Sequence, residues 1–430
     1  MAAPNTITVP GDEWKISDVL VGIPMISRAM ILFVLSASIA AGGCAIPGRH
    51  AAVPRQQESR AEPVELANVR YVVGEAQDME RLRQEFEESW ARERDWLRSQ
   101  GRTARELPPA SFLALSGGGD KGAFGAGLLN GWSATGKRPA FKLVTGISTG
   151  ALIAPFAFLG PDYDAKLKAF YTNSARDDLI RMRSLIAALT DDAIADTAPL
   201  RAMLKKSIDR PFLDAVAAEY VKGRELWVST TNLDANRRVI WNMTRIASSR
   251  DPRALDLFHD VMIASAAIPG AFPPVMIEVE LDGKRYQEMH VDGGATAQVF
   301  VYPPNFNLAK LAREHDGERR RTVYIVVNNR VDPEWAQTER RAITIAERAI
   351  TSLIHTQGIG DLYRIYLTAM RDGMDFNLAY IPPEFTQQPN ELFDMSFMRA
   401  LFETGYRMGG QDGFWKKHPP DFKDDAPAGR

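Results

Sequence analysis

A serine placed between two glycines is the first candidate for chemistry in this chain. Gly146-Ile-Ser-Thr-Gly150 lies where the apolar run 141–147 ends and the small, apolar run 149–159 begins. This order predicts a strand, a sharp turn and a helix, with Ser148 at the turn as a nucleophile. Side chains two residues before and after the serine would collide in so tight a turn, which requires glycine at both positions. The positive N-terminal end of the following helix would favour an alkoxide or a nearby oxyanion.

A second glycine-rich segment comes earlier in the chain. Gly117–Gly119 follows the apolar run 111–116 and precedes a run of small residues, 122–132, that predicts a helix. The backbone N–H groups of three consecutive glycines are not screened by side chains. They could donate to the oxyanion of a tetrahedral intermediate, a contribution of roughly 3–4 kcal/mol per donor. Lys121 adds a positive charge beside this loop.

The same glycines admit other interpretations. Gly117-x-Gly119-x-x-Gly122 satisfies the dinucleotide-binding fingerprint in its strand-to-helix context. That fingerprint also needs an acidic residue about 20 positions later to hold a ribose, and no Asp or Glu lies between Asp120 and Asp162. A phosphate-binding loop would need a Gly-Lys-Ser/Thr ending, which the segment lacks. Glycines that serve only close packing are a further alternative.

The serine needs a base, and the chain offers two kinds. Histidine is the usual base, but none of the histidines after Ser148 lies in a convincing loop after a strand; they are His259, His290, His315, His355 and His418. Asp292 ends an expected strand, and the two glycines that follow permit a sharp turn. An aspartate with a pKa of about 3.9 becomes a useful base when it is desolvated and bonded to the serine hydroxyl. An isolated Asp-Gly-Gly is more often a simple turn. Here the same chain also contains the serine turn and the glycine-rich segment, and this combination favours Asp292 as the base.

Strands and helices alternate through the segment that carries these residues. Further strands are expected at Leu226–Asn232, Arg238–Asn242, Val275–Glu280 and Thr322–Asn328, and helices over Asp256–Ala267 and from about Thr338. This alternation predicts an α/β fold with a mostly parallel sheet covered on both faces. The mixed apolar and charged run 179–206, which includes Leu185 and Leu189, fits either a lid over a lipid-binding mouth or helices packed on the core.

Composition divides the chain into five segments. Residues 1–44 contain an apolar run, and the polar, proline-bearing residues 45–76 predict a linker. Residues 77–108 are densely charged, with apolar side chains near helical spacing. This pattern predicts a solvent-exposed helix whose apolar side chains pack against the domain. Residues 109–415 form the expected α/β domain. Residues 416–430 are short of apolar groups and are expected to be frayed.

The N-terminal segment has the pattern of an export signal. Arg28 precedes an apolar run of about a dozen residues and a stretch of small residues that ends at Cys44. The run is shorter than the roughly 20 residues of a membrane-spanning helix. Small residues before a cysteine resemble a bacterial lipoprotein signal, which implies a lipidated Cys44 as mature N-terminus and a membrane lipid anchor. Ala45 then favours the outer membrane, with the domain facing the periplasm. Plain secretion, an uncleaved anchor and a buried helix are the alternatives.

Four segments together resemble the patatin-like phospholipase family, and they follow in that family's order. They are Gly117–Gly122, Gly146–Gly150, Ala264–Pro274 and Asp292–Gly294. The resemblance spans roughly residues 111–300 and implies a three-layer α/β/α sandwich that hydrolyses acyl esters of lipids. It implies a dyad of Ser148 and Asp292 without histidine. The oxyanion hole that it implies consists of Gly117, Gly118 and Gly119, with Lys121 at the family's basic position.

Composition argues against several other functions. The formal net charge of -2 leaves no basic surplus for nucleic acid. Six scattered histidines and one cysteine do not make a typical zinc site of about three or four ligands, so neither a metal nor another cofactor is expected. A histidine-triad esterase and a catalytically silent lipoprotein that only binds lipid or protein are the alternatives. No feature of the sequence indicates an oligomeric state.

Overall fold

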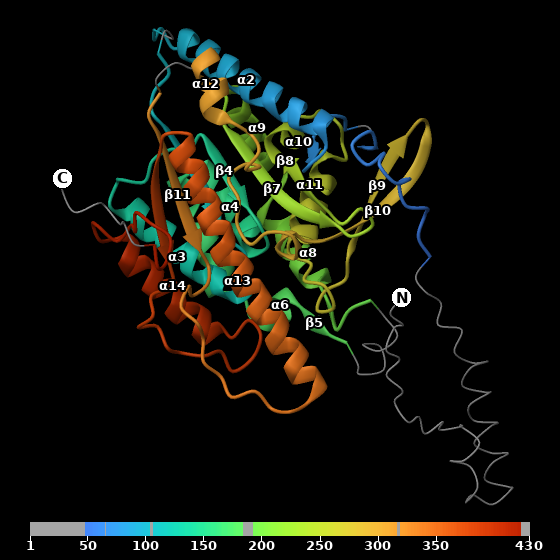
Figure 1. The fold of residues 1–430 in the computed structure, drawn as a ribbon, viewed down its shortest axis with the longest axis vertical. Coiled ribbons are helices and arrows are strands. Elements are labelled where there is room, and N and C mark those ends of the chain that lie inside the picture. Colours follow the sequence, from blue (N-terminus) through green and yellow to red (C-terminus); the bar gives the residue numbers. More distant parts are fainter. Residues whose placement is uncertain (1–47, 65, 104–105, 184–191, 316–318, 423–430) are drawn as a thin grey trace, which may run out of the picture. The chain divides into compact units, whose positions relative to one another are not determined.

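The computed structural model describes residues 48–422 except 65, 104–105, 184–191 and 316–318 (Figure 1). Residues from Arg49 onward form one structural unit. The signal-like segment, with Cys44, lies outside the described residues, and so do Leu185 and Leu189 of the expected lid. Among the described helices, none combines the length and hydropathy that crossing a membrane requires.

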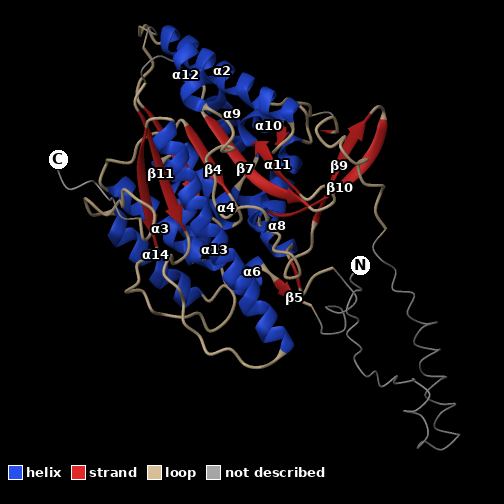
Figure 2. Ribbon diagram, viewed as in Figure 1, coloured by secondary structure: helices blue, strands red, loops and turns tan. Residues whose placement is uncertain are grey.

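A mixed sheet of ten strands forms the centre of this unit (Figure 2). Its strands are β1 (Glu62–Pro63), β2 (Arg70–Val72), β3 (Ala110–Leu115), β4 (Leu143–Gly146), β7 (Glu225–Asn232), β8 (Arg237–Asn242), β9 (Val275–Leu281), β10 (Lys284–Asp292), β11 (Arg321–Val327) and β12 (Met374–Tyr380). The order of the strands is β1-β9-β10-β7-β4-β3-β11-β12. In addition, β8 pairs with β7, and β2 pairs with β8. The strands from β7 to β12 in this order are parallel, and those beyond β7 are antiparallel. A separate pair consists of β5 (Arg181–Met182) and β6 (Ala195–Asp196).

Helices cover both faces of the sheet, because side chains alternate between the faces along each strand. On β3, Leu113 and Leu115 contribute to one apolar core, and Phe112 and Ala114 to the other. The first core is covered by α3 (Gly122–Ala134), α4 (Thr149–Leu159), α5 (Asp164–Thr172), α6 (Arg176–Leu179), α8 (Ala198–Ser207), α9 (Arg210–Val221), α10 (Met243–Ala247), α11 (Ala254–Ser265) and α14 (Met395–Gly409). The second is covered by α2 (Ala76–Ser99), α12 (Leu308–His315) and α13 (Ala342–Arg371). Short 3-10 turns are η2 (Gly119–Lys121), η3 (Pro161–Tyr163) and η4 (Gly293–Ala295). The expected three-layer α/β/α fold is confirmed.

Helix α3 packs on α14 with its backbone in contact. A Cβ atom on Gly127 would lie 2.0 Å from the Phe402 carbonyl oxygen, and one on Gly131 would lie 2.0 Å from that of Tyr406. The contact is reciprocal, since a Cβ atom on Gly405 would lie 2.2 Å from the Phe124 carbonyl oxygen. Gly127 and Gly405 therefore allow these two helices to approach closely.

The prediction of a linker over residues 45–76 is wrong from Arg49 onward. β1 pairs with β9 and β2 with β8, so this stretch extends the sheet. Arg49 forms an ion pair with Asp234 at 2.7 Å, and the buried Arg70 forms one with Glu288. The charged residues that make the segment look like a solvated linker are thus partners of charges in the domain.

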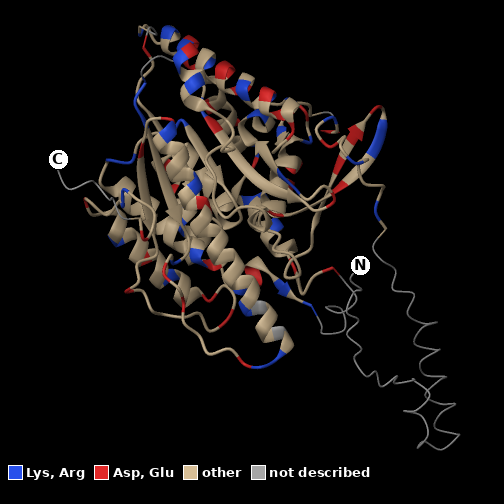
Figure 3. Ribbon diagram, in the orientation of Figure 1, with Lys and Arg blue, Asp and Glu red and all other residues tan. Residues whose placement is uncertain are grey.

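The charged segment that follows forms α2, as expected, and its apolar side chains Leu82, Phe86 and Trp90 are buried in the second core. Acidic and basic residues gather along its outer side (Figure 3). The C-terminal tail is more ordered than expected as far as the structure describes it. Lys416 bridges to Leu378 through two backbone hydrogen bonds of 2.8 and 2.9 Å.

Candidate active site

Ser148 occupies a strained turn between β4 and α4. Its φ of 55° is unusual for a residue with a side chain. A Cβ atom on Gly146 would lie 2.4 Å from the Gly150 carbonyl oxygen, and one on Gly150 would lie 2.3 Å from that of Leu115. The predicted need for glycine on both sides of the serine is confirmed.

Strand β7 brings the serine and Asp292 together through its register. Gly146, the last residue of β4, lies opposite Val228, and Asp292, the last residue of β10, lies opposite Thr230. Because β8 occupies the other edge of β7, β4 and β10 lie on the same edge and meet end to end. Ser148 follows β4 by two residues and so reaches the end of β10.

Asp292 is buried, with 4% of its surface exposed. Its carboxylate accepts a hydrogen bond from the Gly294 amide at 2.7 Å, and it lines the same cleft as Ser148, whose hydroxyl favours the ionised form of Asp292. Burial raises the pKa of Asp292 to about 7, and these two groups oppose the rise only in part. This carboxylate can therefore accept a proton near neutral pH.

The glycine loop crosses the site with its backbone close to other chain segments. A Cβ atom on Gly118 would lie 2.1 Å from the Asn328 carbonyl oxygen. The Gly117 amide donates to the Gln298 carbonyl at 3.1 Å, so the assignment of that amide to the oxyanion hole is wrong. Among the described residues, the amides of Gly118 and Gly119 have no acceptor.

Asn328 holds the glycine loop in place. It lies just beyond β11, where its backbone amide donates to the Ser116 hydroxyl and its side-chain amide donates to the Ser116 carbonyl, both at 2.8 Å. Its side-chain oxygen accepts from the Gly125 amide at 3.0 Å. Lys121 donates to Asn329 at 3.0 Å and lines the cleft beside the loop.

Two further polar residues support the site and were missed in the sequence. The Ser148 amide donates to the Ser265 hydroxyl at 3.0 Å, which in turn donates to the Ser229 carbonyl at 2.7 Å. The Gln298 side chain donates to the Gly294 carbonyl at 2.7 Å. Ser265 belongs to the Ala-Ser-Ala-Ala run that looks like scaffold, whereas Gln298 carries no recognisable sequence signal.

Two of the candidate histidines are buried and bond to groups other than Ser148 and Asp292. His290 lies between the Thr230 hydroxyl at 2.8 Å and Glu288 at 3.0 Å, and burial lowers its pKa. His259 bonds to the Ile208 carbonyl at 2.8 Å. Neither of these two histidines is therefore placed to act on Ser148. Nor does the described part of the chain contain a group of three or more His, Cys, Asp or Glu residues arranged to hold a metal.

Ser148 lies where two cavities meet. The larger is a cleft of about 670 Å³ lined by the glycine loop, Asp292 and three apolar side chains of α13, Ile350, Leu353 and Ile354. The narrower one, of about 130 Å³, is lined almost entirely by apolar side chains, including those of Leu152, Phe170, Leu179, Leu200, Phe272 and Met398. The site therefore offers an apolar pocket on one side of the serine and a wider, partly polar cleft on the other.

Residues 113–304 match the family model described as patatin-like phospholipase. None of the curated proteins matches the chain. Similar solved structures include VipD from Legionella pneumophila, 12% identical over 70% of this chain and 66% of that chain with a TM-score of 0.36. Human GIVD cytosolic phospholipase A2 is 10% identical over 81% of this chain and 64% of that chain, with a TM-score of 0.35. ExoU in complex with SpcU from Pseudomonas aeruginosa is 13% identical over 71% of this chain and 52% of that chain, with a TM-score of 0.29. The alignments cover less than two thirds of each of those chains.

Proposed function

We propose that this protein hydrolyses acyl esters of lipids, with Ser148 as nucleophile and Asp292 as base, because residues 113–304 match the patatin-like phospholipase family model. One observation carries the proposal. A serine in a strained turn shares a cleft with a buried carboxylate whose pKa burial raises to about 7. A base with such a pKa matches neutral working conditions.

The first half of the reaction forms an acyl-enzyme. The Ser148 oxygen attacks the ester carbonyl carbon and gives its proton to Asp292, while the carbonyl electron pair moves to oxygen. The amides of Gly118 and Gly119 donate to this oxyanion, aided by the N-terminal end of α4. When the intermediate collapses, the alcohol leaves with the proton from Asp292 and the acyl group remains on Ser148.

The second half releases the acid. Asp292 takes a proton from a water molecule, whose oxygen attacks the acyl carbon. Collapse of this second intermediate breaks the bond to Ser148, which regains its proton from Asp292. A carboxylate with a pKa of about 7 can both accept and return the proton near neutral pH.

The cavities on the two sides of the serine favour a lipid ester. The narrow apolar pocket suits an acyl chain, and the wider cleft, with Lys121 on its wall, suits the alcohol portion and an anionic head group. Leu353, at the edge of this cleft, is 70% exposed. Exposed apolar side chains around a site commonly mark contact with lipid or protein. The substrate class is thus that of a phospholipase A, lysophospholipase or lipid esterase.

Hydrolysis of two substrates tests the proposal: p-nitrophenyl butyrate in solution and phosphatidylcholine in mixed micelles. The wild-type protein should release p-nitrophenol and fatty acid, whereas a folded Ser148→Ala variant should release neither. Equal rates for the two proteins would refute the nucleophile assignment. Inactivity of the wild-type protein on both substrates would favour the alternative of a protein that only binds lipid.

We further propose that Cys44 is lipidated and anchors the domain to the outer membrane on its periplasmic side. Because packing begins at Arg49, only residues 45–48 separate Cys44 from the folded domain. Such an anchor keeps the site close to its lipid substrate. A Cys44→Ser variant should move from the membrane pellet to the soluble fraction and keep its activity on p-nitrophenyl butyrate. An intact mass with unmodified residues upstream of Cys44 on the exported protein would contradict the anchor.

A further inference from the structure

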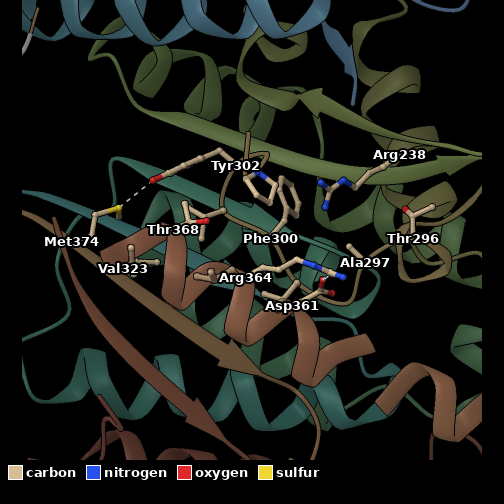
Figure 4. A pocket seen from close by; sticks show the side chains of 15 residues that line it. Arg238, Thr296, Ala297, Phe300, Tyr302, Val323, Asp361, Arg364, Thr368 and Met374 are labelled. Carbon is tan, nitrogen blue, oxygen red and sulfur yellow. Dashed lines mark hydrogen bonds and ion pairs between the residues drawn. The ribbon is translucent and has the colours of Figure 1, made fainter. Parts of the chain in front are cut away.

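A further cavity, of about 300 Å³, lies between α13, β8 and the segment that follows η4 (Figure 4). One end is apolar and is formed by Val323, Met374 and the ring of Tyr302. The guanidinium groups of Arg238 and Arg364 lie toward the other end, where they approach the cavity from β8 and α13. The cavity is therefore amphipathic along its length.

The charged end carries an excess positive charge. Asp361 accepts hydrogen bonds from the Arg364 side chain at 2.6 Å and from the Gln298 amide at 2.7 Å. Arg238 has neither an ion-pair partner nor a hydrogen-bond acceptor for its side chain among the described residues, and it lies over the Phe300 ring at 5.6 Å. Two arginines thus face one carboxylate that is already bonded on both of its oxygens.

The position of Arg238 is costly for a lone cation. Burial lowers the pKa of this guanidinium, and the carboxylate of Asp361 offsets the effect only in part. The side chain is half-buried, and an anion bound beside it would supply the partner that the guanidinium lacks among the described residues. Guanidinium groups bind carboxylates and phosphates through paired N–H donors.

We propose that this cavity binds a medium-chain fatty carboxylate, with its head group on Arg238 and Arg364 and its chain along Tyr302 toward Met374. The apolar end requires a chain, and the charged end requires one anionic group. A volume of about 300 Å³ lies at the lower limit of small-molecule sites, which favours a chain of medium length. Hydrolysis at Ser148 would supply such an anion, and this part of the inference rests on the proposed function. The binding itself does not depend on the proposed function.

Titration calorimetry with octanoate tests the site. The wild-type protein should bind about one equivalent of octanoate saturably. The affinity of Arg238→Gln for octanoate should be at least about tenfold lower, because this variant loses a charged hydrogen bond to the ligand. Arg237→Gln is the matched control on the same strand, since Arg237 is exposed and does not line the cavity. It should bind as the wild-type protein does. Arg364→Gln, at a side chain that is 61% exposed, provides a second weakened variant that should fold normally.

Octanol and inorganic phosphate separate the two parts of the ligand. Both should bind more weakly than octanoate, because each lacks either the anionic group or the chain. Absence of saturable octanoate binding, equal binding by Arg238→Gln, or phosphate binding as strong as octanoate binding would overturn the proposal. Hydrolysis of p-nitrophenyl butyrate by Arg238→Gln should equal that of the wild-type protein. If the wild-type protein proves inactive, the proposed function fails while the binding measurement remains valid.

Discussion

Two buried aspartates on either side of Gln298 have similar burial but different neighbours. Asp292 and Asp361 are each 4% exposed, and burial raises the pKa of both. The groups that stabilise ionised Asp292 are both uncharged, the Ser148 hydroxyl and the Gly294 amide. The pKa of Asp292 is raised to about 7.

The environment of Asp361 contains positive charge. Arg364 donates to this carboxylate, and the charges of Arg364 and Arg238 both oppose the rise of its pKa. The comparison shows that burial alone does not decide the role of a carboxylate. We propose Asp292 as the base because no positive charge compensates its burial and it shares a cleft with Ser148, whereas the guanidinium of Arg364 makes Asp361 a structural anchor.

Replacing each carboxylate by its amide should give the largest difference. Asp292→Asn should lower kcat/KM for p-nitrophenyl butyrate by about 10³-fold or more, because the serine loses its base. Asp361→Asn should retain activity within about tenfold, since this residue touches neither the serine nor the ester. Steady-state kinetics on folded variants measures both, with His290→Ala as a further control that should stay substantially active. Equal losses in the two aspartate variants would end the distinction between base and anchor.

The stability of the fold should reveal the cost of keeping Asp292 buried. Its folded pKa of about 7 lies above the ordinary value of 3.8, so the folded state binds more protons between these pH values and stability falls as pH rises through this window. The loss is at most about 4 kcal/mol, because a pKa difference of one between the folded and unfolded states corresponds to about 1.4 kcal/mol. Asp292→Asn should therefore be more stable than the wild-type protein in urea at pH 8. This advantage should disappear at pH 3.5, and an equal advantage at both pH values would show that it does not come from the buried charge.

The pH dependence of activity should follow the same group. The ionised form of Asp292 is the base, so kcat/KM should rise with pH through a midpoint near 7 and fall about tenfold per unit below it. Asp361→Asn should leave this midpoint unchanged. Rate profiles on a soluble ester from pH 5 to 9 measure it, and a flat profile over this range would exclude Asp292 as the titrating base.

The smallest effect is expected far from both carboxylates. Leu353→Ser changes only the exposed apolar edge of the cleft, so it should slow hydrolysis of micellar phosphatidylcholine a few-fold through weaker contact with the lipid surface. Hydrolysis of p-nitrophenyl butyrate should be unchanged. A parallel loss on both substrates would assign Leu353 to the shape of the site rather than to contact with lipid aggregates.

The turns that carry Ser148 and Asp292 could be predicted from the sequence because their geometry depends on local steric rules. The turn at Ser148 cannot form without Gly146 and Gly150, and the strand before Asp292 ends in glycines. Four of the five described parallel strands could be predicted for a similar reason, since each is a short apolar run bounded by turn residues, whereas β12 was not among the expected strands. Their order could not, because it depends on which strands pair in space.

The supporting residues could not be predicted, because their hydrogen bonds join segments far apart in the chain. Asn328 bonds to Ser116 across 212 positions, and the Ser148 amide bonds to Ser265 across 117. Buried ion pairs could not be predicted either, because the sequence does not reveal the partner of a charged residue. Arg70 looks like part of a polar linker until its partner Glu288 is known. The Gly117 assignment was wrong for the same reason, because Gln298 already accepts its amide proton.

Covalent labelling with a fluorescent phosphonate, followed by peptide mass mapping across pH, tests the central claim most directly. The proposed dyad predicts a single adduct on Ser148, with a labelling rate that rises through a midpoint near pH 7. The base acts before the covalent bond forms, so this rate should fall by about 10³-fold in Asp292→Asn. An adduct on another residue, or wild-type labelling of Ser148 in Asp292→Asn, would contradict a dyad in which Asp292 activates Ser148.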